Sequence, residues 1–283
     1  MEDVDDMSPS IPGALLPGAE PFEHAGGPVG VLLCHGFTGS PATLRPWAEY
    51  LAAAGLTVSL PRLPGHGTTW QEMSRTRWED WHAEIERAFA ELQGHTSEIF
   101  AMGISMGACL ALRLAAQHGP EVAGLVLVNP SVTADTKLFL LAPALKLVVP
   151  SLKGIGSDIK KEGATEISYD RVPVRALASL PQLWKLTQQR LGDVRQPVLA
   201  YHSTTDHVVG PASMRVLQAA LPAGQLTVRE CGNSYHVATL DNDADEIFAG
   251  SLEFIRAHSR AGSPPGLIAA PDAGEGVTGS DGG

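Results

Sequence analysis

Short apolar segments alternate with helix-forming segments along most of the 283-residue chain. The apolar segments are nearly continuous runs rather than alternating patterns, which is typical of strands in a parallel sheet covered on both faces. Strands are predicted at 29–35, 57–61, 98–103, 124–129, 197–202 and 225–230, and helices at 42–54, 78–92, 106–118, 212–221 and 243–258. This alternation predicts an α/β fold with a doubly wound, mostly parallel sheet.

One long interval interrupts this rhythm, because no clear strand lies between Asn129 and Gln196. An inserted helical cap over the carboxyl ends of the strands, where open α/β sheets bind ligands, accounts for it best. The expected organisation is therefore a core at 13–130 and 196–260 with a cap, or lid, at 131–195. The acidic segment 1–12 is expected to be flexible, and the Gly- and Pro-rich segment 261–283 is expected to be disordered.

Composition limits the classes of partner. The formal net charge is −11, which argues against nucleic acid, since phosphate binding needs a basic face. The start MEDVDDMSPS has no positive charge followed by an apolar run, and the apolar stretch 138–150 contains a lysine and two prolines and is too short to span a bilayer. A cytoplasmic protein is expected, with transient membrane-surface contact through the lid as an option.

The cysteine and histidine spacing indicates neither a disulfide framework nor a metal site. The chain has three cysteines, an odd and sparse set that is no disulfide framework, and Cys34 and Cys109 fall in apolar patterns typical of buried thiols. No CxxC or HExxH motif occurs. Neither a metal nor a cofactor is predicted.

The segment GISMG at 103–107 matches G-x-S-x-G, the nucleophile-elbow pattern, and lies between a predicted strand and a predicted helix. Such a turn forces Ser105 into an unfavourable backbone conformation, and Gly103 and Gly107 remove side chains that would clash with the neighbouring strand and helix. The pattern is short enough to arise by chance, and an ordinary turn containing serine stays an alternative. A nucleophilic serine also needs a general base and an orienting acid.

In this type of fold the acid and then the base follow the serine in the chain. His236 lies just after the predicted strand 225–230, and Asp206 follows the predicted strand 197–202, so both fall at carboxyl ends of strands. Asp193 precedes its strand and falls at the wrong end, while Asp241 and Asp243 are interpreted as caps of the last helix. The alternative interpretations are a turn aspartate at 206 and a structural histidine at 236.

The attack on an ester creates an oxyanion that needs two N–H donors. One is the backbone N–H after the nucleophile, at Met106, and the other is expected in the loop CHGFTGS, at Phe37. His35 precedes the nucleophile in the chain and is interpreted as structural.

Together these segments resemble the α/β-hydrolase superfamily, most closely its bacterial monoacylglycerol lipases and related small carboxylesterases. PVGVLLCHGFTGSP, LPRLPGHGT, GISMG, TDHVV, NSYHVATLD and the cap segment IGSDIKKEGATEISYDRVP occur in the same order as in that branch. The resemblance implies Ser105, Asp206 and His236 as the catalytic triad and Phe37 and Met106 as oxyanion donors. It also implies a lid with an acyl tunnel and a small glycerol pocket, with Glu166 and Ile155 as substrate-binding residues.

The predicted function is therefore hydrolysis of a lipid ester, a monoacylglycerol, through an acyl-serine. A solvated charge at Glu166 and ordinary packing at Ile155 stay open as alternatives. A carboxylesterase of broader, shorter-chain specificity would use the same triad. A hydrolase-fold ligand-binding protein without turnover is a second alternative, whereas a dehalogenase would need Asp at the elbow.

Overall fold

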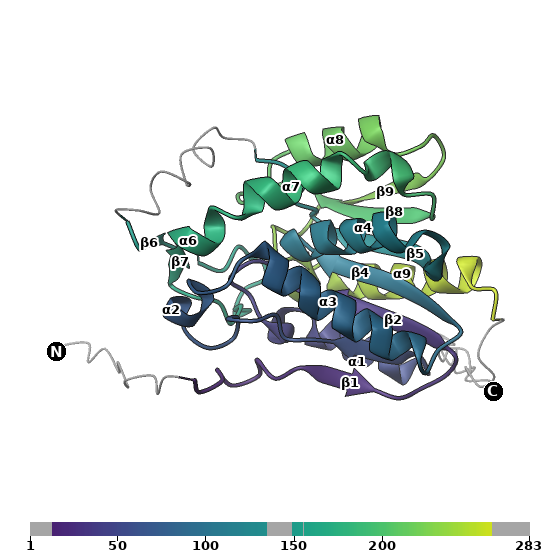
Figure 1. Ribbon diagram of the computed structural model, residues 1–283, viewed down its shortest axis with the longest axis horizontal. Coiled ribbons are helices and arrows are strands. Elements are labelled where there is room, and N and C mark those ends of the chain that lie inside the picture. Colours follow the sequence, from purple (N-terminus) through teal and green to yellow (C-terminus); the bar gives the residue numbers. More distant parts are fainter. Residues whose placement is uncertain (1–12, 135–148, 155, 262–283) are drawn as a thin grey trace, which may run out of the picture.

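The computed structural model describes residues 13–134, 149–154 and 156–261 (Figure 1). Its centre is a seven-stranded sheet with the order β1-β3-β2-β4-β5-β8-β9, in which β1 is antiparallel to β3 and the other neighbours are parallel. The strands are β1 (Phe22–His24), β2 (Val29–Cys34), β3 (Thr57–Leu60), β4 (Glu98–Ile104), β5 (Val122–Val128), β8 (Val198–Ser203) and β9 (Leu226–Cys231).

All six predicted strands are present, and their ends differ from the prediction by at most two residues. β2 is completely buried, and β4 and β5 are buried at all but one position each. Continuous apolar runs are what two covered faces require, which is why these strands could be predicted. The short edge strand β1 was not predicted, because FEH has no apolar run and is held by pairing with β3.

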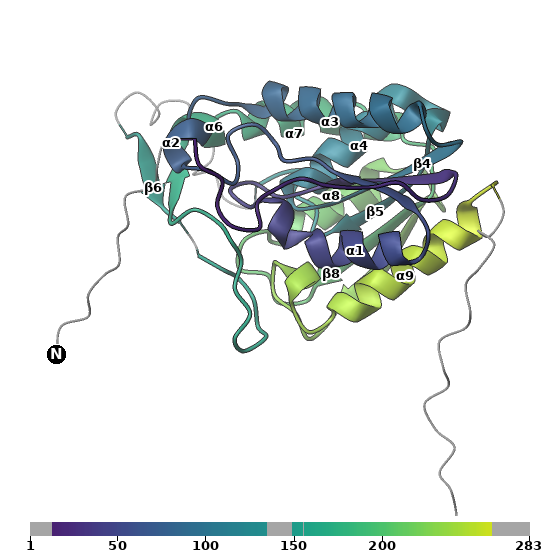
Figure 2. The same cartoon turned by 90° about the horizontal axis from the view of Figure 1, so that it is seen from below.

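Helices cover both faces of the sheet, and Figure 2 shows α1 and α9 on one side and α3 and α4 on the other. The α-helices outside the cap are α1 (Arg45–Ala53), α2 (Trp70–Met73), α3 (Trp78–Gln93), α4 (Met106–His118), α8 (Ala212–Ala220) and α9 (Ala244–His258). Short 3₁₀ helices occupy Pro41–Thr43, Gly119–Glu121, Leu191–Asp193 and Ala238–Leu240. Each of the five predicted helices is present.

The two faces of the sheet build two apolar clusters. One contains the buried side chains of α3 and α4, with Trp81 and Phe89 among the largest, and the other packs α1 and α9 together through Trp47 and Phe248. Burial of side chains this large supplies most of the stabilising free energy of such a domain. The sheet is thereby packed between two layers of helices.

The described residues between β5 and β8 are here called the cap. Its described elements are β6 (Ser151–Lys153), β7 (Arg171–Pro173), α6 (Val174–Leu177) and α7 (Leu180–Gln188). Figure 1 shows β6, β7 and α6 together at one end of the molecule, with α7 running back over α4. The expectation that this interval lacks strands is wrong, because β6 and β7 pair as a small antiparallel sheet.

Several predictions concern residues outside the described part of the chain. These are the flexible segment 1–12, all but the first residue of the tail 261–283, and most of the apolar stretch 138–150. Among the described residues, no helix is long and apolar enough to cross a membrane.

Candidate active site

Ser105 lies on a sharp turn between β4 and α4. Its φ and ψ are 55° and −119°, a backbone conformation that is costly for any residue except glycine. A β-carbon on Gly103 would lie 2.6 Å from the backbone carbon of Gly107, so the turn is too tight for a side chain there. The two predicted glycine roles are confirmed, and Ser105 is presented at the end of β4 as a nucleophile elbow requires.

The predicted acid and base meet although they come from different loops. His236, in the loop after β9, places Nδ1 2.7 Å from Oδ2 of Asp206, in the loop after β8. The two side chains are 9 % and 3 % exposed, so water competes little for this hydrogen bond. A carboxylate on Nδ1 fixes the tautomer in which Nδ1 donates, and leaves Nε2 free to accept a proton.

The environment of Asp206 favours its charged form. Burial alone would raise the pKa of this carboxyl group, but the hydrogen bond and charge of His236 act in the other direction. The backbone N–H groups of Val208 and Val209 also donate to Oδ1, at 2.8 and 2.7 Å. The net result is a lowered pKa, so Asp206 is an anion that can stabilise a protonated His236.

Asn129, the residue directly after β5, binds the loop after β9 that contains His236. The side-chain nitrogen of Asn129 donates to the carbonyl oxygen of His236 at 2.8 Å, and its oxygen accepts from the backbone N–H of Ser203 at 2.8 Å. Asn129 is buried and has a φ of 43°, which is uncommon for a residue other than glycine. Asn129 was predicted only as the last residue of the strand 124–129, because its partners His236 and Ser203 lie far along the chain.

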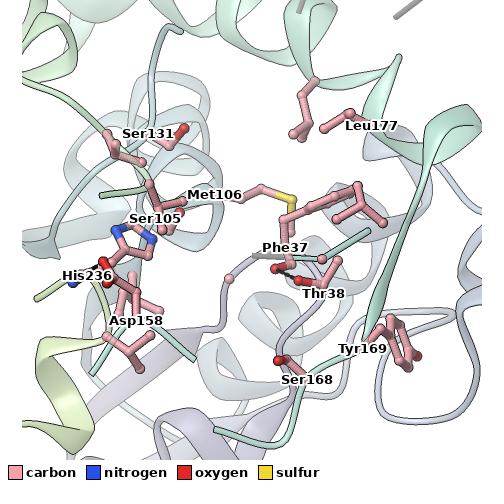
Figure 3. Close-up of a pocket in the computed structure, with 18 of the residues that line it drawn as sticks. Phe37, Thr38, Ser105, Met106, Ser131, Asp158, Ser168, Tyr169, Leu177 and His236 are labelled. Atoms are coloured by element: carbon pink, nitrogen blue, oxygen red, sulfur yellow. Dashed lines mark hydrogen bonds between the residues drawn. The ribbon is translucent and has the colours of Figure 1, made fainter. Parts of the chain in front are cut away.

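The two residues predicted as oxyanion donors line the same cavity as Ser105. Met106 is the first residue of α4, so its N–H has no partner within the helix. Phe37 follows β2, and in the described part of the chain its N–H donates to no other protein group. Figure 3 shows Phe37, Met106 and Ser105 around one cavity. Two N–H groups at this place are suited to an oxyanion.

His35 orders the loop that carries Phe37. Its Nε2 accepts from the backbone N–H of Leu63 at 3.1 Å, so Nδ1 carries the proton and donates to the carbonyl oxygen of Gly36 at 3.0 Å. Complete burial lowers the pKa of His35 to about 4 and keeps it neutral. His35 therefore has the structural role that its position in the chain predicted.

Phe37 packs against two aromatic side chains, His66 and Trp81, which were not predicted from the sequence. The Phe37 ring packs edge-on against Trp81 and His66, with ring centres 5.6 and 6.4 Å apart. His66 and Trp81 also contact each other, and both are fully buried. His66, the histidine of the segment GHG at 65–67, thus helps to fix Phe37, one of the two predicted donors.

The cavity has a volume of about 520 Å³, within the range of small-molecule sites, and both Ser105 and His236 line it. Much of its wall is apolar and comes from the cap: Val172, Val174, Leu177, Leu180 and Trp184. Thr38, Thr43, Glu166 and Ser168 supply polar groups. In the view of Figure 3, Leu177 and Ser168 lie on different sides of the cavity with Phe37 between them.

Glu166 is the acidic group of this polar region. Thr43 donates its hydroxyl to Oε1 of Glu166 at 2.9 Å, and the backbone N–H of Glu166 donates to the hydroxyl of Ser157 at 3.0 Å. Removal of the carboxyl group from water raises its pKa, an effect that the Thr43 bond and the nearby His236 partly offset. Glu166 is thus no solvated surface charge, whereas Ile155 lies outside the described residues.

Two aspartates join the cap to the base-carrying loop. Asp158 accepts from the backbone N–H of His236 at 3.1 Å, and buried Asp241 accepts from the backbone N–H groups of Lys160, Lys161 and Tyr235 at 2.7, 2.8 and 2.9 Å. The interpretation of Asp241 as a helix cap is therefore wrong. Asp243 does occupy the predicted N-cap position, directly before α9. Its side chain makes no capping hydrogen bond, however.

No group of three or more His, Cys, Asp and Glu side chains suited to a metal ion occurs in the described ranges. The chemistry available at the site is thus that of a serine, an imidazole, a carboxylate and two backbone donors, next to a cavity with apolar and polar walls. This set can form and hydrolyse an acyl-serine.

The chain is similar to known lipases and esterases. Over 253 residues the chain is 40 % identical to a thermostable monoacylglycerol lipase from Bacillus sp. (strain H-257), covering 89 % of this chain and 100 % of that protein. It is 24 % identical to a carboxylesterase from Bacillus subtilis (strain 168), over 83 % of this chain and 96 % of that protein.

Among solved structures, one from work on the metagenome-derived lipolytic enzymes LipS and LipT matches with a TM-score of 0.84 and 39 % identity. The match covers 87 % of this chain and 100 % of that one. The sequence profile of the family described as "Serine aminopeptidase, S33" matches residues 29–243. The chain therefore belongs to this serine hydrolase family of the α/β-hydrolase superfamily.

Proposed function

We propose that this protein hydrolyses monoacylglycerols to glycerol and a free fatty acid, with Ser105 as nucleophile, His236 as base and Asp206 as acid. One observation carries the proposal: a single cavity holds Ser105 and His236 between an apolar cap wall and a polar region that contains Glu166. An acyl chain needs the first surface and a glycerol group needs the second. The 40 % identity to a monoacylglycerol lipase over nearly the whole chain supports it.

In the first half of the reaction, His236 Nε2 takes the proton of Ser105 as the serine oxygen attacks the ester carbonyl carbon. The carbonyl oxygen becomes negatively charged and accepts hydrogen bonds from the N–H groups of Phe37 and Met106. Asp206, held 2.7 Å from Nδ1, stabilises the protonated imidazole. The bond to glycerol then breaks, and glycerol leaves with the proton from His236.

In the second half, a water molecule gives a proton to His236 and attacks the acyl-serine carbonyl. The same two N–H groups stabilise the second oxyanion. Ser105 then regains its proton from His236, and the fatty acid is released. No cofactor takes part in this sequence, since every proton is passed between His236, Ser105, water and the leaving group.

Glu166 is proposed to select for glycerol. Glu166 lines the cavity. The Thr43 hydroxyl donates to Oε1 of Glu166, which occupies one lone pair of that carboxylate. The remaining lone pairs can accept hydrogen bonds from a glycerol hydroxyl, and a hydrogen bond to a charged group contributes about 1.5–3 kcal/mol. Ile155 stays a proposal from the resemblance alone, as a further residue of the substrate site.

We further propose that substrate enters from a lipid surface. Leu152 and Val208 both line the cavity and are about 38 % and 39 % exposed. Exposed apolar side chains at a cavity mouth suit transient contact with lipid. Substitution of both by serine should then lower turnover of vesicle-bound monoacylglycerol more than turnover of a dissolved short ester.

The decisive experiment measures fatty-acid release from monolauroylglycerol, dilauroylglycerol and p-nitrophenyl butyrate. Wild type should cleave the monoacylglycerol with the highest kcat/KM, and Ser105→Ala should lose about 10⁴- to 10⁶-fold in kcat on every ester. Glu166→Gln should lose about tenfold or more in kcat/KM on monolauroylglycerol and far less on p-nitrophenyl butyrate. Glu162→Gln, which changes an exposed carboxylate of the same cap, is the matched control.

The other results separate the alternatives. Efficient cleavage of the short ester alone, with no effect of Glu166→Gln, would indicate a broad carboxylesterase like the Bacillus subtilis relative. Cleavage of an aminoacyl amide instead of any ester would favour the peptidase activity named in the family description. Ligand binding without turnover in wild type would point to a binding protein.

A further inference from the structure

Asp158 of the cap lies where the loops of Asp206 and His236 meet. Oδ2 of Asp158 accepts from the backbone N–H of His236 at 3.1 Å and from that of His207 at 3.2 Å. One oxygen is therefore bonded both to His236, the base, and to His207, the residue directly after the acid Asp206. The side chain is only 10 % exposed, so these bonds are largely shielded from water.

Asp158 makes two more contacts with the same loops. Oδ1 lies 2.7 Å from Nδ1 of His207, and the backbone carbonyl oxygen of Asp158 accepts from the N–H of Val237 at 3.1 Å. The His207 ring packs edge-on against Tyr235, the residue before His236, with ring centres 4.7 Å apart. Figure 3 shows Asp158 directly beside His236 at the edge of the cavity.

The segment around Asp158, residues 157–161, is here called the cap strap. Its far end is fixed by Asp241, which accepts from the N–H groups of Lys160 and Lys161 and also from that of Tyr235. Both ends of the strap are thus bonded to the loop that carries His236. Because buried carboxylates are costly unless donors satisfy them, each aspartate stabilises this one arrangement of strap and loop strongly.

The hydrogen bond between Asp206 and His236 needs such support. The two residues follow different strands, and their 2.7 Å contact closes only if both loops keep their relative position. Asp158 bonds to both loops through one carboxylate. A displacement of about 1 Å at a catalytic group can cost about 100-fold in rate.

We propose that Asp158 is a positioning residue, which holds the acid loop and the base loop in register and makes the geometry of His236 depend on the cap. Oδ2 accepts from two backbone N–H groups and Oδ1 lies 2.7 Å from Nδ1 of His207, so Asp158 acts through the two loops, at the border of the cavity. The proposal rests on the role of the triad in the proposed function, but not on the preference for monoacylglycerols.

The test compares Asp158→Ala, Asp158→Asn and the control Asp170→Ala, an exposed aspartate of the same cap. With p-nitrophenyl butyrate, kcat of Asp158→Ala should fall about 10- to 100-fold with KM within about twofold of wild type. Asp158→Asn keeps one acceptor oxygen and should lose only about 3- to 10-fold. The rate at which a fluorophosphonate labels Ser105 should fall in the same order, and Asp170→Ala should match wild type.

An NMR measurement distinguishes loss of the Asp206–His236 geometry from a general loss of protein stability. The proton between His236 Nδ1 and Asp206 gives a far-downfield NMR signal, which should shift or broaden in Asp158→Asn and disappear in Asp158→Ala. An unchanged signal with kcat within twofold of wild type in Asp158→Ala would overturn the proposal. If Asp158→Ala does not fold, the same result in Asp158→Asn would overturn it.

Failure of the proposed function would look different. A wild-type protein that cleaves no ester and whose Ser105 does not react with the fluorophosphonate would contradict the triad itself. Reaction of Ser105 at wild-type rate in all Asp158 variants contradicts only the role of Asp158.

Discussion

A β-carbon on Gly107 would lie 1.9 Å from the carbonyl oxygen of Cys34, closer than any non-bonded contact allows. The start of α4 therefore packs directly on the end of β2, and this contact brings the elbow next to the loop of Phe37. The contact partner is backbone, which cannot rotate away as a side chain can. The second glycine of the elbow motif is thus required by helix–strand packing.

Gly107→Ala should consequently lose about 3 kcal/mol of unfolding free energy and nearly all activity, because the added methyl group forces helix and strand apart. Thermal unfolding and ester hydrolysis measure both effects. Gly192→Ala is the matched control, since a β-carbon there meets nothing within 4 Å, and its midpoint should stay near that of wild type. Near-normal activity in Gly107→Ala would contradict the described elbow.

Asp206→Asn should lower kcat about 10⁴-fold, because an amide cannot hold His236 in the required tautomer or stabilise its charge. Asp193→Asn provides the control, since the Asp193 side chain is half exposed and pairs with Arg190 on the surface, at 2.8 Å. Hydrolysis of p-nitrophenyl butyrate by both variants tests the assignment. A larger loss in Asp193→Asn would place the acid elsewhere.

Asn129→Ala should be both less stable and less active. It removes the bonds to His236 and Ser203, leaves a buried N–H group unsatisfied at about 1–3 kcal/mol, and puts alanine at a φ of 43°. Asn129→Gly loses the same bonds without the backbone strain, so the difference between the two variants measures that strain. Equal unfolding midpoints would show that the positive φ costs little.

Glu166 should make stability depend on pH in the opposite sense to Asp206. A carboxyl group whose pKa is raised in the folded protein destabilises it as pH rises from the ordinary value of 4.5 through the raised value. Glu166→Gln removes this cost, so its unfolding midpoint should exceed that of wild type at a pH above the raised value. Below pH 4.5 the difference should vanish, because both states are then protonated.

The matched control for this pH effect is again Glu162→Gln, which changes an exposed carboxylate. Its midpoint should follow that of wild type at all pH values. A Glu166→Gln midpoint below that of wild type at neutral pH would mean that the charge of Glu166 stabilises the fold.

The three cysteines should be inert in the folded protein. Cys34, Cys109 and Cys231 are all buried and free, and burial raises the pKa of the Cys109 and Cys231 thiols to about 12. A thiol reagent such as Ellman's reagent needs an exposed thiolate, so no cysteine should react at neutral pH until the protein unfolds. Activity should therefore survive treatment with the reagent, and rapid reaction of one thiol would contradict its burial.

The sequence allowed prediction of those features that depend on local pattern. Continuous apolar runs indicated β2, β4, β5 and β8, and short motifs at strand ends indicated the positions of Ser105, Asp206 and His236. Contacts between distant segments left no such pattern. β6 and β7 exist because they pair with each other, and SLK and RVP alone predict no strand.

The same reason explains the misinterpreted aspartate. Asp241 stands three residues before a helix, as a capping residue could, but its carboxylate binds N–H groups of the cap about eighty residues earlier in the chain. Asp158 was not singled out at all, because its partners, His207 and His236, come much later in the sequence. Such residues become visible only when the fold brings the segments together.

The cap starts after β5 and returns at β8, two strands that are direct neighbours in the sheet. An insertion whose ends are so close can change in length or be exchanged without disturbing the sheet. The bonds of Asp158 and Asp241 limit this freedom. A chimera that receives the cap of another hydrolase would retain an undistorted triad only if the incoming cap brings an aspartate at position 158 and backbone donors for Asp241.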